Sequence, residues 1–406
     1  MQKTRTTISK ITFLITLVVV LMTLAAIIFP ALYHYSFGNY PDKLESQFEI
    51  GHQAYLIICG NIVIFAIGFA YYKNKIPFIG TKIDQIRQFE ISKKISVIIL
   101  IIILGTYVGF STPELFLDER EQWADYIILE EALEYWPGGE SKIPNPYIDE
   151  QLDRHVRLVL LDASVKIFQN IKILPFMASI LVILFTYLLT VQITEKRFAG
   201  IIAILVLIQS HTFLRFDTVA VYENFWVLFY LLSIYVIKKQ WILSPIFYIL
   251  SFFTKAFVAP YFIMTILFAT RTSISAKKKI LLLISYLAII GISALVVFSG
   301  DTIYPNVIQI DPSKFFIGLA TFGPLLRYDF LLLMTILPIV VGLTLLTKNS
   351  FKETDSILFL ILGTLLAGPI LIMFTNFYEI LPYRYIPLIV FFAIGIGMFF
   401  SKKSIS

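Results

Sequence analysis

The sequence predicts an all-helical protein that crosses a membrane many times. Hydrophobic residues make up 58% of the 406 residues and charged residues only 15%, whereas soluble domains are roughly half apolar and about a quarter charged. Apolar stretches near the ~20 residues that a bilayer-spanning helix needs recur along the chain. The single cysteine, Cys59, lies inside one of these stretches, so a disulfide framework and a cysteine metal site are excluded.

Twelve apolar segments are expected to span the membrane, two of them before the main domain. The first follows Lys3, Arg5 and Lys10 and is too long for the core of a signal peptide, so we expect a retained anchor helix. We divide the chain into two extra N-terminal spans (1–94) and a main membrane domain (95–406). The predicted spans are 11–33, 54–72, 95–110, 171–191, 198–214, 219–237, 241–253, 256–270, 280–299, 327–347, 355–375 and 383–401.

The distribution of basic residues predicts the orientation of these spans. With the N-terminus inside, the inner segments hold 21 of the 33 Lys and Arg residues, and cytoplasmic loops are enriched in these residues. Both termini are therefore expected in the cytoplasm. The basic residues are spread over seven inner segments, which argues against a nucleic-acid partner and fits contact with anionic membrane lipid.

The long outer loop, 111–170, is expected to contain two amphipathic helices. Proline and glycine residues at 137–139 and 144–146 separate them. Spacings of three and four fit helices lying in the membrane interface, and a soluble cap packed on the bundle is the alternative. The apolar positions are Trp123, Tyr126, Leu129, Leu133 and Trp136 in the first helix, and Leu152, Val156, Val159, Ala163 and Ile167 in the second.

The two short segments 241–253 and 256–270 are separated by Thr254 and Lys255. One continuous helix would place Lys255 near the middle of the membrane, where a charge is costly, whereas a hairpin places it at the outer surface. We therefore expect a hairpin with Lys255 at its tip and a recess beside the short helices.

Polar residues near the ends of the spans gather on the outer side. Ordinary solvated ends would be divided between both faces, so the outer face is predicted to carry the function. The residues are Asp118, Glu119, Arg215, Asp217, Glu223, Lys255, Asp301, Arg327, Asp329, Glu379 and Arg384.

Asp118 and Glu119 are the candidate catalytic residues, because they closely follow an apolar segment and lie near Trp123. A carboxylate in this position can act as a general base or help to hold a divalent cation through hard oxygen ligands. Ordinary solvated loop acids are the alternative. Lys255 is interpreted as an anion-binding residue, with a snorkelling side chain as the alternative.

The roles of three other outer candidates depend on their pairing. Arg215 and Asp217 can bind substrate or can pair with one another at the start of a helix. Glu223 is expected about one turn inside the apolar segment that follows, where an acid is costly unless it is paired.

Two arginines are candidates later in the chain. A cation at the start of a helix opposes the macrodipole, so Arg384 is interpreted as part of an anion site, with a pair to Glu379 as the alternative. Arg327 can bind an anion or pair with Asp329. The four histidines do not have the spacing of metal ligands, so no metal is assigned. The sequence contains no glycine-rich phosphate loop, which argues against a nucleotide-dependent enzyme.

Four segments resemble those of the GT-C superfamily of polytopic glycosyltransferases. The similar group contains the protein O-mannosyltransferases and the lipid A aminoarabinose transferases. The segments are Leu117-Asp-Glu119 with Ala124, Arg215-Phe-Asp-Thr-Val-Ala-Val-Tyr-Glu-Asn-Phe-Trp226, Ser251-Phe-Phe-Thr-Lys-Ala256 and Tyr383-Arg-Tyr-Ile-Pro387. Their order and outer side match over about residues 95 to 400. The departures are residues 1–94, Ala256 where the family has glycine, and the lack of a large C-terminal soluble domain.

The resemblance implies transfer of a sugar from a polyprenyl-phosphate donor to a glycan, lipid or protein acceptor outside the cytoplasm. It also implies an integral membrane protein, and we expect it in the plasma membrane. Asp118 matches the family's catalytic base, and Glu119 assists it or binds substrate. Lys255, Arg384 and Tyr385 are the expected contacts of the lipid phosphate. A lipid-monophosphate leaving group needs no metal in principle, so no cofactor is assigned. A transporter or flippase of an anionic lipid-linked glycan and a polymerase of lipid-linked repeats are the alternatives.

Overall fold

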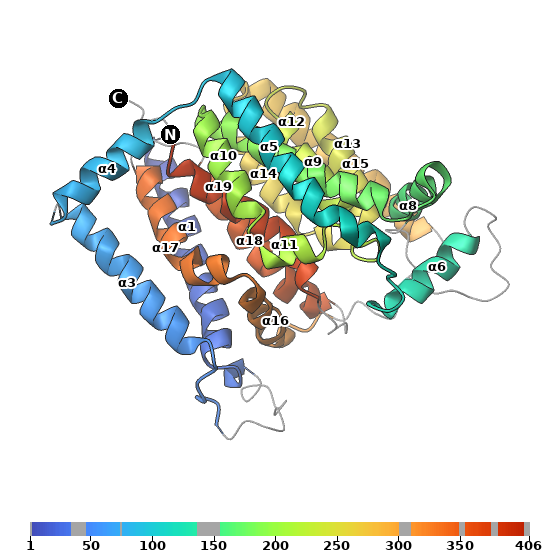
Figure 1. Cartoon of the computed structure of the whole chain (residues 1–406), viewed down its shortest axis with the longest axis horizontal. Helices are drawn as coiled ribbons and strands as arrows, with labels where there is room; N and C mark the ends of the chain where they lie inside the picture. The colour runs from blue at the N-terminus through green and yellow to red at the C-terminus, as the bar shows by residue number, and fades with distance from the viewer. Residues whose placement is uncertain are drawn as a thin grey trace. The chain divides into compact units, whose positions relative to one another are not determined.

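The computed structural model describes residues 2–33, 46–73, 75–135, 155–299, 310–348, 354–374 and 381–401 (Figure 1). All regular structure in these ranges is helical, and none of them contains a strand. The prediction of an all-helical protein is therefore confirmed.

The helices fall into long apolar helices and shorter connecting ones. In chain order they are α1 (Gln2–Ile28), α3 (Ala54–Tyr72), α4 (Pro77–Gln88), α5 (Lys93–Ser111), η1 (Thr112–Phe116), α6 (Asp125–Tyr135), α8 (His155–Phe168), α9 (Ile173–Thr194), α10 (Arg197–Leu207), α11 (His211–Arg215), α12 (Phe225–Val236), α13 (Leu243–Thr254), η3 (Ala256–Val258), α14 (Tyr261–Arg271), α15 (Ala276–Ser299), α16 (Lys314–Phe322), η4 (Gly323–Tyr328), α17 (Phe330–Lys348), α18 (Thr354–Phe374), η5 (Pro382–Tyr385) and α19 (Ile386–Met398).

Several helices are long and apolar enough to cross a membrane, as expected of a membrane protein. The described ranges contain five such helices. They contain six if Lys314–Tyr328 and Phe330–Leu346, which are bent by 114° at Asp329, are counted as one span. Shorter apolar helices lie within other predicted segments, among them α12, α13 and α14. The five are Ser9–Ile28, Ala54–Tyr71, Lys93–Phe116, Ile173–Thr194 and Thr354–Phe374.

Each of the twelve predicted apolar segments overlaps at least one helix, although the boundaries differ in places. The segment 198–214 is divided into α10 and α11, and the helix in segment 219–237 begins only at Phe225. The helices α4 and α16 were not predicted. Two helices, α6 and α8, lie within the segment 111–170, although the predicted position Trp123 precedes the start of α6 and Trp136 and Leu152 lie outside the described residues.

Threonine hydroxyl groups inside the apolar helices bond to the backbone of their own helix. Thr16 donates to the carbonyl oxygen of Thr12 at 2.6 Å, and Thr186 donates to that of Val182 at 2.7 Å. An unpaired hydroxyl is costly in a hydrocarbon environment, and this bond to the preceding turn removes the cost without a partner helix. These polar residues therefore remain compatible with membrane helices.

The chain forms two compact units. The first unit consists of Met1–Ile98, Tyr187–Thr212 and Val307–Ser406, and the second consists of Ile99–Thr186 and Phe213–Asn306. Both units are assembled from segments far apart in the sequence.

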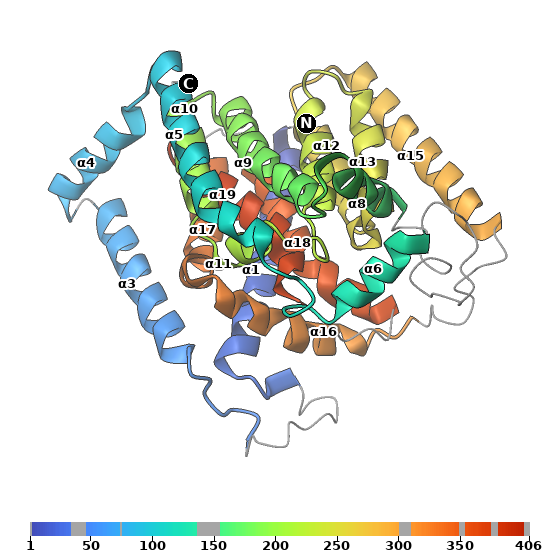
Figure 2. The same ribbon diagram turned by 45° about the vertical axis from the view of Figure 1, so that its right-hand side comes forward.

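In the first unit, α18 is the central helix and packs against α1, α16, α17 and α19 (Figure 2). A Cβ atom added at Gly368 would lie 2.4 Å from ring atoms of Phe322. The glycine therefore allows α16 to approach α18 closely.

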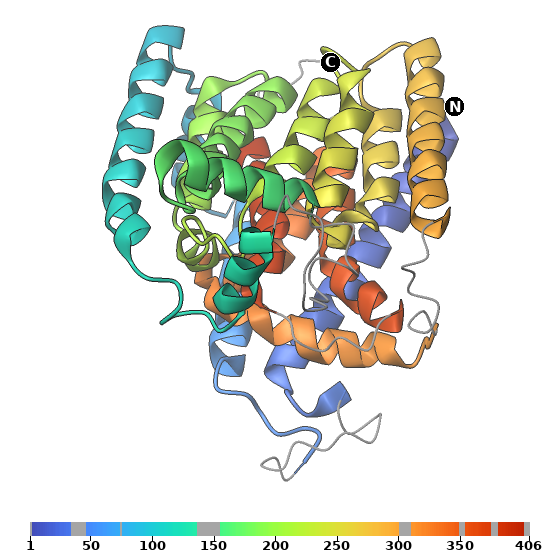
Figure 3. The ribbon, with the colours of Figure 1, turned by 90° about the vertical axis from the view of Figure 1, so that its right-hand side faces the viewer.

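In the second unit, α13 packs against α8, α12 and α15, and α14 packs against α12 and α15 (Figure 3). The backbone breaks at Lys255, whose φ of −158° and ψ of 115° are extended rather than helical. The prediction that α13 and α14 are separate helices with Lys255 between them is confirmed.

Replacing Gly368 by alanine is expected to destabilise the protein by about 1–3 kcal/mol, because the new methyl group overlaps the buried ring of Phe322. Thermal unfolding of the detergent-solubilised protein measures the change. Gly105→Ala is the matched control, because no atom lies within 4 Å of a Cβ added there. Equal unfolding temperatures for the two variants would contradict the proposed close contact.

Candidate functional site

The candidate site lies in the second unit, where three segments meet. They are the loop that follows α5 (111–125), the turn between α8 and α9 (169–172) and the segment before α12 (215–224). Hydrogen bonds join these segments to one another. Asp118, Glu119, Arg215, Asp217 and Glu223 all belong to them.

Glu119 is buried, with 2% of its surface exposed. Its two carboxylate oxygens accept hydrogen bonds from the backbone N–H groups of Ala220 at 2.7 Å and Val221 at 3.2 Å. Burial raises the pKa of Glu119, and these N–H donors and Lys172 act in the opposite direction. Glu119 therefore joins the loop after α5 to the segment before α12.

Lys172 holds the same loop from the other side. The residue is 4% exposed, and its Nζ atom donates to the carbonyl oxygens of Glu114 at 2.9 Å and Leu117 at 2.7 Å. The Nζ atom also lies 3.8 Å from Oε1 of Glu119. An ammonium group has three donors, and here three acceptors in one short loop surround it.

Asp118 differs from its neighbour because its side chain is exposed. One carboxylate oxygen accepts the backbone N–H of Arg120 at 2.9 Å, which fixes the orientation of the group. A carboxylate has about four acceptor positions, so this bond leaves most of them open to solvent. The two adjacent acids therefore divide into a buried anchor and an accessible carboxylate that can accept a proton or bind a ligand.

Glu223 pairs with Arg157, which the sequence did not mark as a candidate. The Nε atom of Arg157 lies 3.3 Å from Oε2 of Glu223, and both side chains are buried. Arg157 also donates to the carbonyl oxygen of Val221 at 2.8 Å. Because α12 begins only at Phe225, Glu223 lies in a loop and not one turn inside the helix, which corrects the prediction.

Arg215 and Asp217 do not pair with one another, so that predicted alternative is wrong. The guanidinium group of Arg215 is exposed and lies 5.5 Å from the ring centre of Trp123. Asp217 is buried and accepts a hydrogen bond from the Ser111 hydroxyl group at 2.7 Å. A neutral hydroxyl group thus takes the place of the expected cation.

Burial raises the pKa of Asp217 to about 7, and the hydrogen bond from Ser111 acts in the opposite direction. The nearby carboxylate of Glu114 raises the pKa further. Asp217 is therefore a group in this site whose charge changes near neutral pH.

Trp123 lies between the exposed and buried parts of the site. Its ring packs against Phe216 at 5.5 Å and Tyr222 at 5.0 Å between ring centres. The hydroxyl group of Tyr222 donates to Asp125 at 2.7 Å. These contacts fix the loop beyond Asp118, so the exposed carboxylate is held on both sides by packed residues.

The remaining predicted cations have different surroundings. Lys255 is half-buried in the second unit, whereas Arg327, Arg384 and Tyr385 belong to the first unit. Arg384 is half-buried and donates to the Tyr383 hydroxyl group at 3.5 Å, and its predicted alternative partner Glu379 lies outside the described residues. Tyr385 is buried, with its ring 5.9 Å from that of Phe322.

Arg327 does not pair with Asp329, so that alternative is also wrong. Arg327 donates to the hydroxyl group of Tyr328 at 3.1 Å, whereas Asp329 accepts a hydrogen bond from the Ser210 hydroxyl group at 2.5 Å. The described part of the chain contains no group of three His, Cys, Asp or Glu residues placed to hold a metal ion.

Comparison with protein-family models, with curated proteins and with solved structures gave no match.

Replacing Lys172 by methionine is expected to destabilise the protein by about 3–5 kcal/mol, because the buried carboxylate of Glu119 loses its cation. Thermal unfolding in detergent measures this loss, and limited proteolysis measures the opening of the loop 111–125. Lys166→Met is the matched control, because the pair of Lys166 with Asp162 is at the surface. If both lysine variants lost equal stability, the buried contact would not be the cause.

The pKa of Asp217 predicts a pH dependence of stability. The folded state holds the proton up to about pH 7, whereas the unfolded carboxyl group loses it near 3.8. The free energy of unfolding therefore falls as pH rises between these values, by up to roughly 1.4 kcal/mol per pH unit.

Asp217→Asn should remove this contribution and give a flatter dependence of the unfolding temperature between about pH 4 and pH 7. Asp162→Asn, at the surface, is the control. An unchanged slope in the Asp217 variant would show that this carboxyl group does not titrate in that range.

Proposed function

We propose that this protein is a membrane-embedded inverting glycosyltransferase that uses a polyprenyl-phosphate sugar as donor. The observation that carries the proposal is the division of the acid pair: Glu119 is buried and bonded, whereas Asp118 is accessible on a loop held from both sides. A fixed, accessible carboxylate suits a general base, since proton transfer needs a defined distance to the reacting hydroxyl group.

In the proposed reaction, Asp118 accepts the proton of the acceptor hydroxyl group as its oxygen attacks the anomeric carbon of the donor sugar. A new C–O bond forms on one face of the ring, and the bond to the lipid phosphate breaks on the opposite face. The anomeric configuration is thereby inverted, and the lipid monophosphate leaves with the electron pair. Lys255 and Arg384 are proposed to stabilise its increasing negative charge.

The other predicted site residues receive modified roles. Glu119 and Glu223 are proposed to shape the site through their buried pairs with Lys172 and Arg157, not to contact the reacting atoms. Arg215, stacked on Trp123 at the surface, is proposed to contact the substrate. Asp217, Arg327 and Tyr385 complete the proposed substrate-binding set.

The proposed topology has twelve membrane crossings with both termini in the cytoplasm. It places Asp118 on the outer face of a plasma membrane and α6 and α8 in the membrane interface. The support is the excess of Lys and Arg in the inner segments. Residues 1–94 are proposed to form two additional spans before the family-like domain.

Asp118→Asn tests the proposed base, because it keeps the size of the side chain and removes its basicity. Transfer from a panel of polyprenyl-phosphate sugars should fall by about a hundredfold or more, with donor binding retained. Glu121→Gln, an exposed acid three residues along the same loop, is the matched control and should keep full turnover.

Equal turnover in the Asp118 variant and the wild type would refute this role. Addition of several sugars to one lipid-linked product would favour a polymerase. Movement of labelled lipid across vesicles without transfer from any donor would favour a transporter and overturn the proposal.

A further inference from the structure

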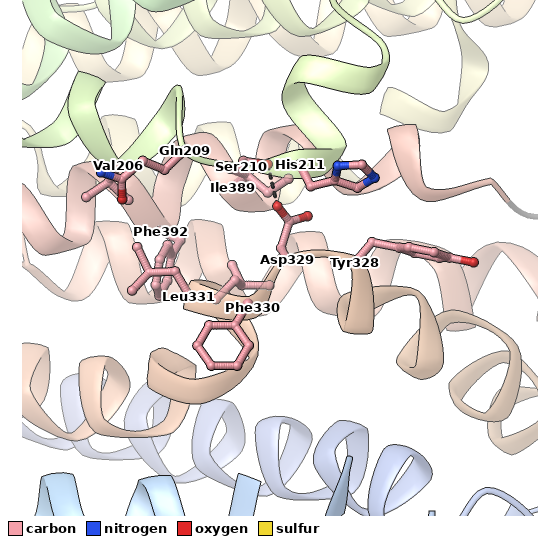
Figure 4. A pocket seen from close by; sticks show the side chains of 11 residues that line it. Val206, Gln209, Ser210, His211, Tyr328, Asp329, Phe330, Leu331, Ile389 and Phe392 are labelled. Carbon is pink, nitrogen blue, oxygen red and sulfur yellow. Dashed lines mark hydrogen bonds between the residues drawn. The ribbon is translucent and has the colours of Figure 1, made fainter. Parts of the chain in front are cut away.

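The first unit contains a cavity of about 350 Å³ at the start of α17 (Figure 4). Its walls come from the end of α10 and the turn after it, from the turn and first residues of α17, and from α19. This volume is at the lower end of the range for sites that bind small ligands. The lining residues are Val206, Gln209, Ser210, His211, Tyr328, Asp329, Phe330, Leu331, Leu332, Ile389 and Phe392. We call this cavity the Asp329 pocket.

Polar groups in the Asp329 pocket come from two short stretches of chain. Gln209, Ser210 and His211 form one, and Tyr328 with Asp329 forms the other. The other lining residues are aliphatic or phenylalanine side chains. An apolar cavity with a small number of convergent polar groups suits a ligand that has an apolar body and one polar group.

Asp329 is buried, with 6% of its surface exposed. Oδ1 accepts hydrogen bonds from the Ser210 hydroxyl group at 2.5 Å and from the backbone N–H of Thr212 at 3.4 Å. Figure 4 shows its carboxyl group pointing toward Ser210 and His211. Both donors are neutral and bond to the same oxygen, so Oδ2 can accept further hydrogen bonds.

No Lys or Arg in the described part of the chain forms an ion pair with Asp329. The neighbouring Arg327 is exposed and lies over the ring of Tyr328, 5.1 Å from its centre. The helix α17 begins at the next residue, and its N-terminus offsets part of the negative charge. The net result is a buried carboxylate in an apolar cavity that favours hydrogen-bond donors and positive charge.

We propose that the Asp329 pocket binds an amphiphile whose head group is an ammonium or hydroxyl group. The head group donates to Oδ2 of Asp329, and the apolar body lies against Leu331, Ile389 and Phe392. An anionic head group is rejected, because it would bring a second negative charge to a buried carboxylate. The lining of the pocket includes neither Asp118 nor Glu119, so this proposal does not rest on the proposed glycosyl transfer.

The carboxylate predicts an order of affinity among ligands with the same chain. An ammonium group forms a charge-assisted hydrogen bond, which is stronger than the bond of a neutral hydroxyl group. We expect an alkylamine to bind most tightly, the matched alcohol to bind more weakly, and the matched alkyl phosphate not to bind in this pocket.

Photolabelling tests the proposal with three probes that carry the same diazirine-bearing chain and end in an amine, an alcohol or a phosphate monoester. The full-length protein is labelled in detergent at neutral pH, and the modified peptides are identified by mass spectrometry. The amine should label the stretches 206–211 and 328–332 in preference to other apolar segments.

In the Asp329→Asn variant, the amine probe should label these stretches about tenfold less than in the wild type. Its labelling should then equal that of the alcohol probe. Asparagine retains an oxygen that accepts from Ser210 and Thr212, so the fold should survive. Asp311→Asn is the control, because that acid in the first unit bonds to Ser313 outside the pocket.

Val206→Trp, at a partly exposed lining position, should fill the cavity and abolish labelling by both amine and alcohol.

Unfolding temperatures recorded for each variant separate loss of the site from loss of the fold. Labelling by the phosphate probe equal to that by the amine would overturn the proposal. So would labelling that is unchanged in well-folded Asp329→Asn and Val206→Trp proteins, or the absence of labelling of these stretches in the wild type.

Discussion

The contact between the Glu119 carboxylate and the Lys172 ammonium group is the constraint on which the rest of the candidate site depends. Both groups are almost fully buried, and moving an ion out of water costs several kcal/mol unless the remaining hydrogen-bonding capacity is used. Here it is used: two backbone N–H groups bond to the carboxylate and two carbonyl oxygens accept from the ammonium group. Any movement of the loop would break several of these bonds together.

This cooperation explains why two adjacent acids have different environments. The backbone that carries Glu119 inward carries Asp118 outward, because consecutive residues in the loop cannot both face the same buried donors. Arg157 supports the arrangement, since it bonds to the carbonyl oxygens of the same two residues, Ala220 and Val221, whose N–H groups hold Glu119. The rigidity at Asp118 therefore comes from contacts that Asp118 does not make.

The helices could be predicted well from the sequence because apolarity and helix breaks are local properties. The break at Lys255 could be predicted from the cost of a charge in the membrane, and the helices α6 and α8 from the spacing of their apolar residues. Pairing could not be predicted in this way. Arg215 with Asp217 and Arg327 with Asp329 were natural partners in the sequence, yet each aspartate bonds to a serine more than a hundred positions away. A serine carries no charge that would mark it as a partner, and Arg157 resembled any other polar residue of an amphipathic helix.

Asp217 and Asp329 are both buried carboxylates that bond to a neutral hydroxyl group instead of a cation. The hydrogen bond offsets part of the desolvation cost but leaves the charge in place. That charge can then be removed by a proton or balanced by a ligand. At Asp217, burial favours the proton and raises the pKa to about 7. At Asp329 a cavity lies beside the carboxylate, so a ligand that donates a hydrogen bond can reach it. The surroundings of the carboxyl group, and not the residue type, therefore decide which function such a buried aspartate can have.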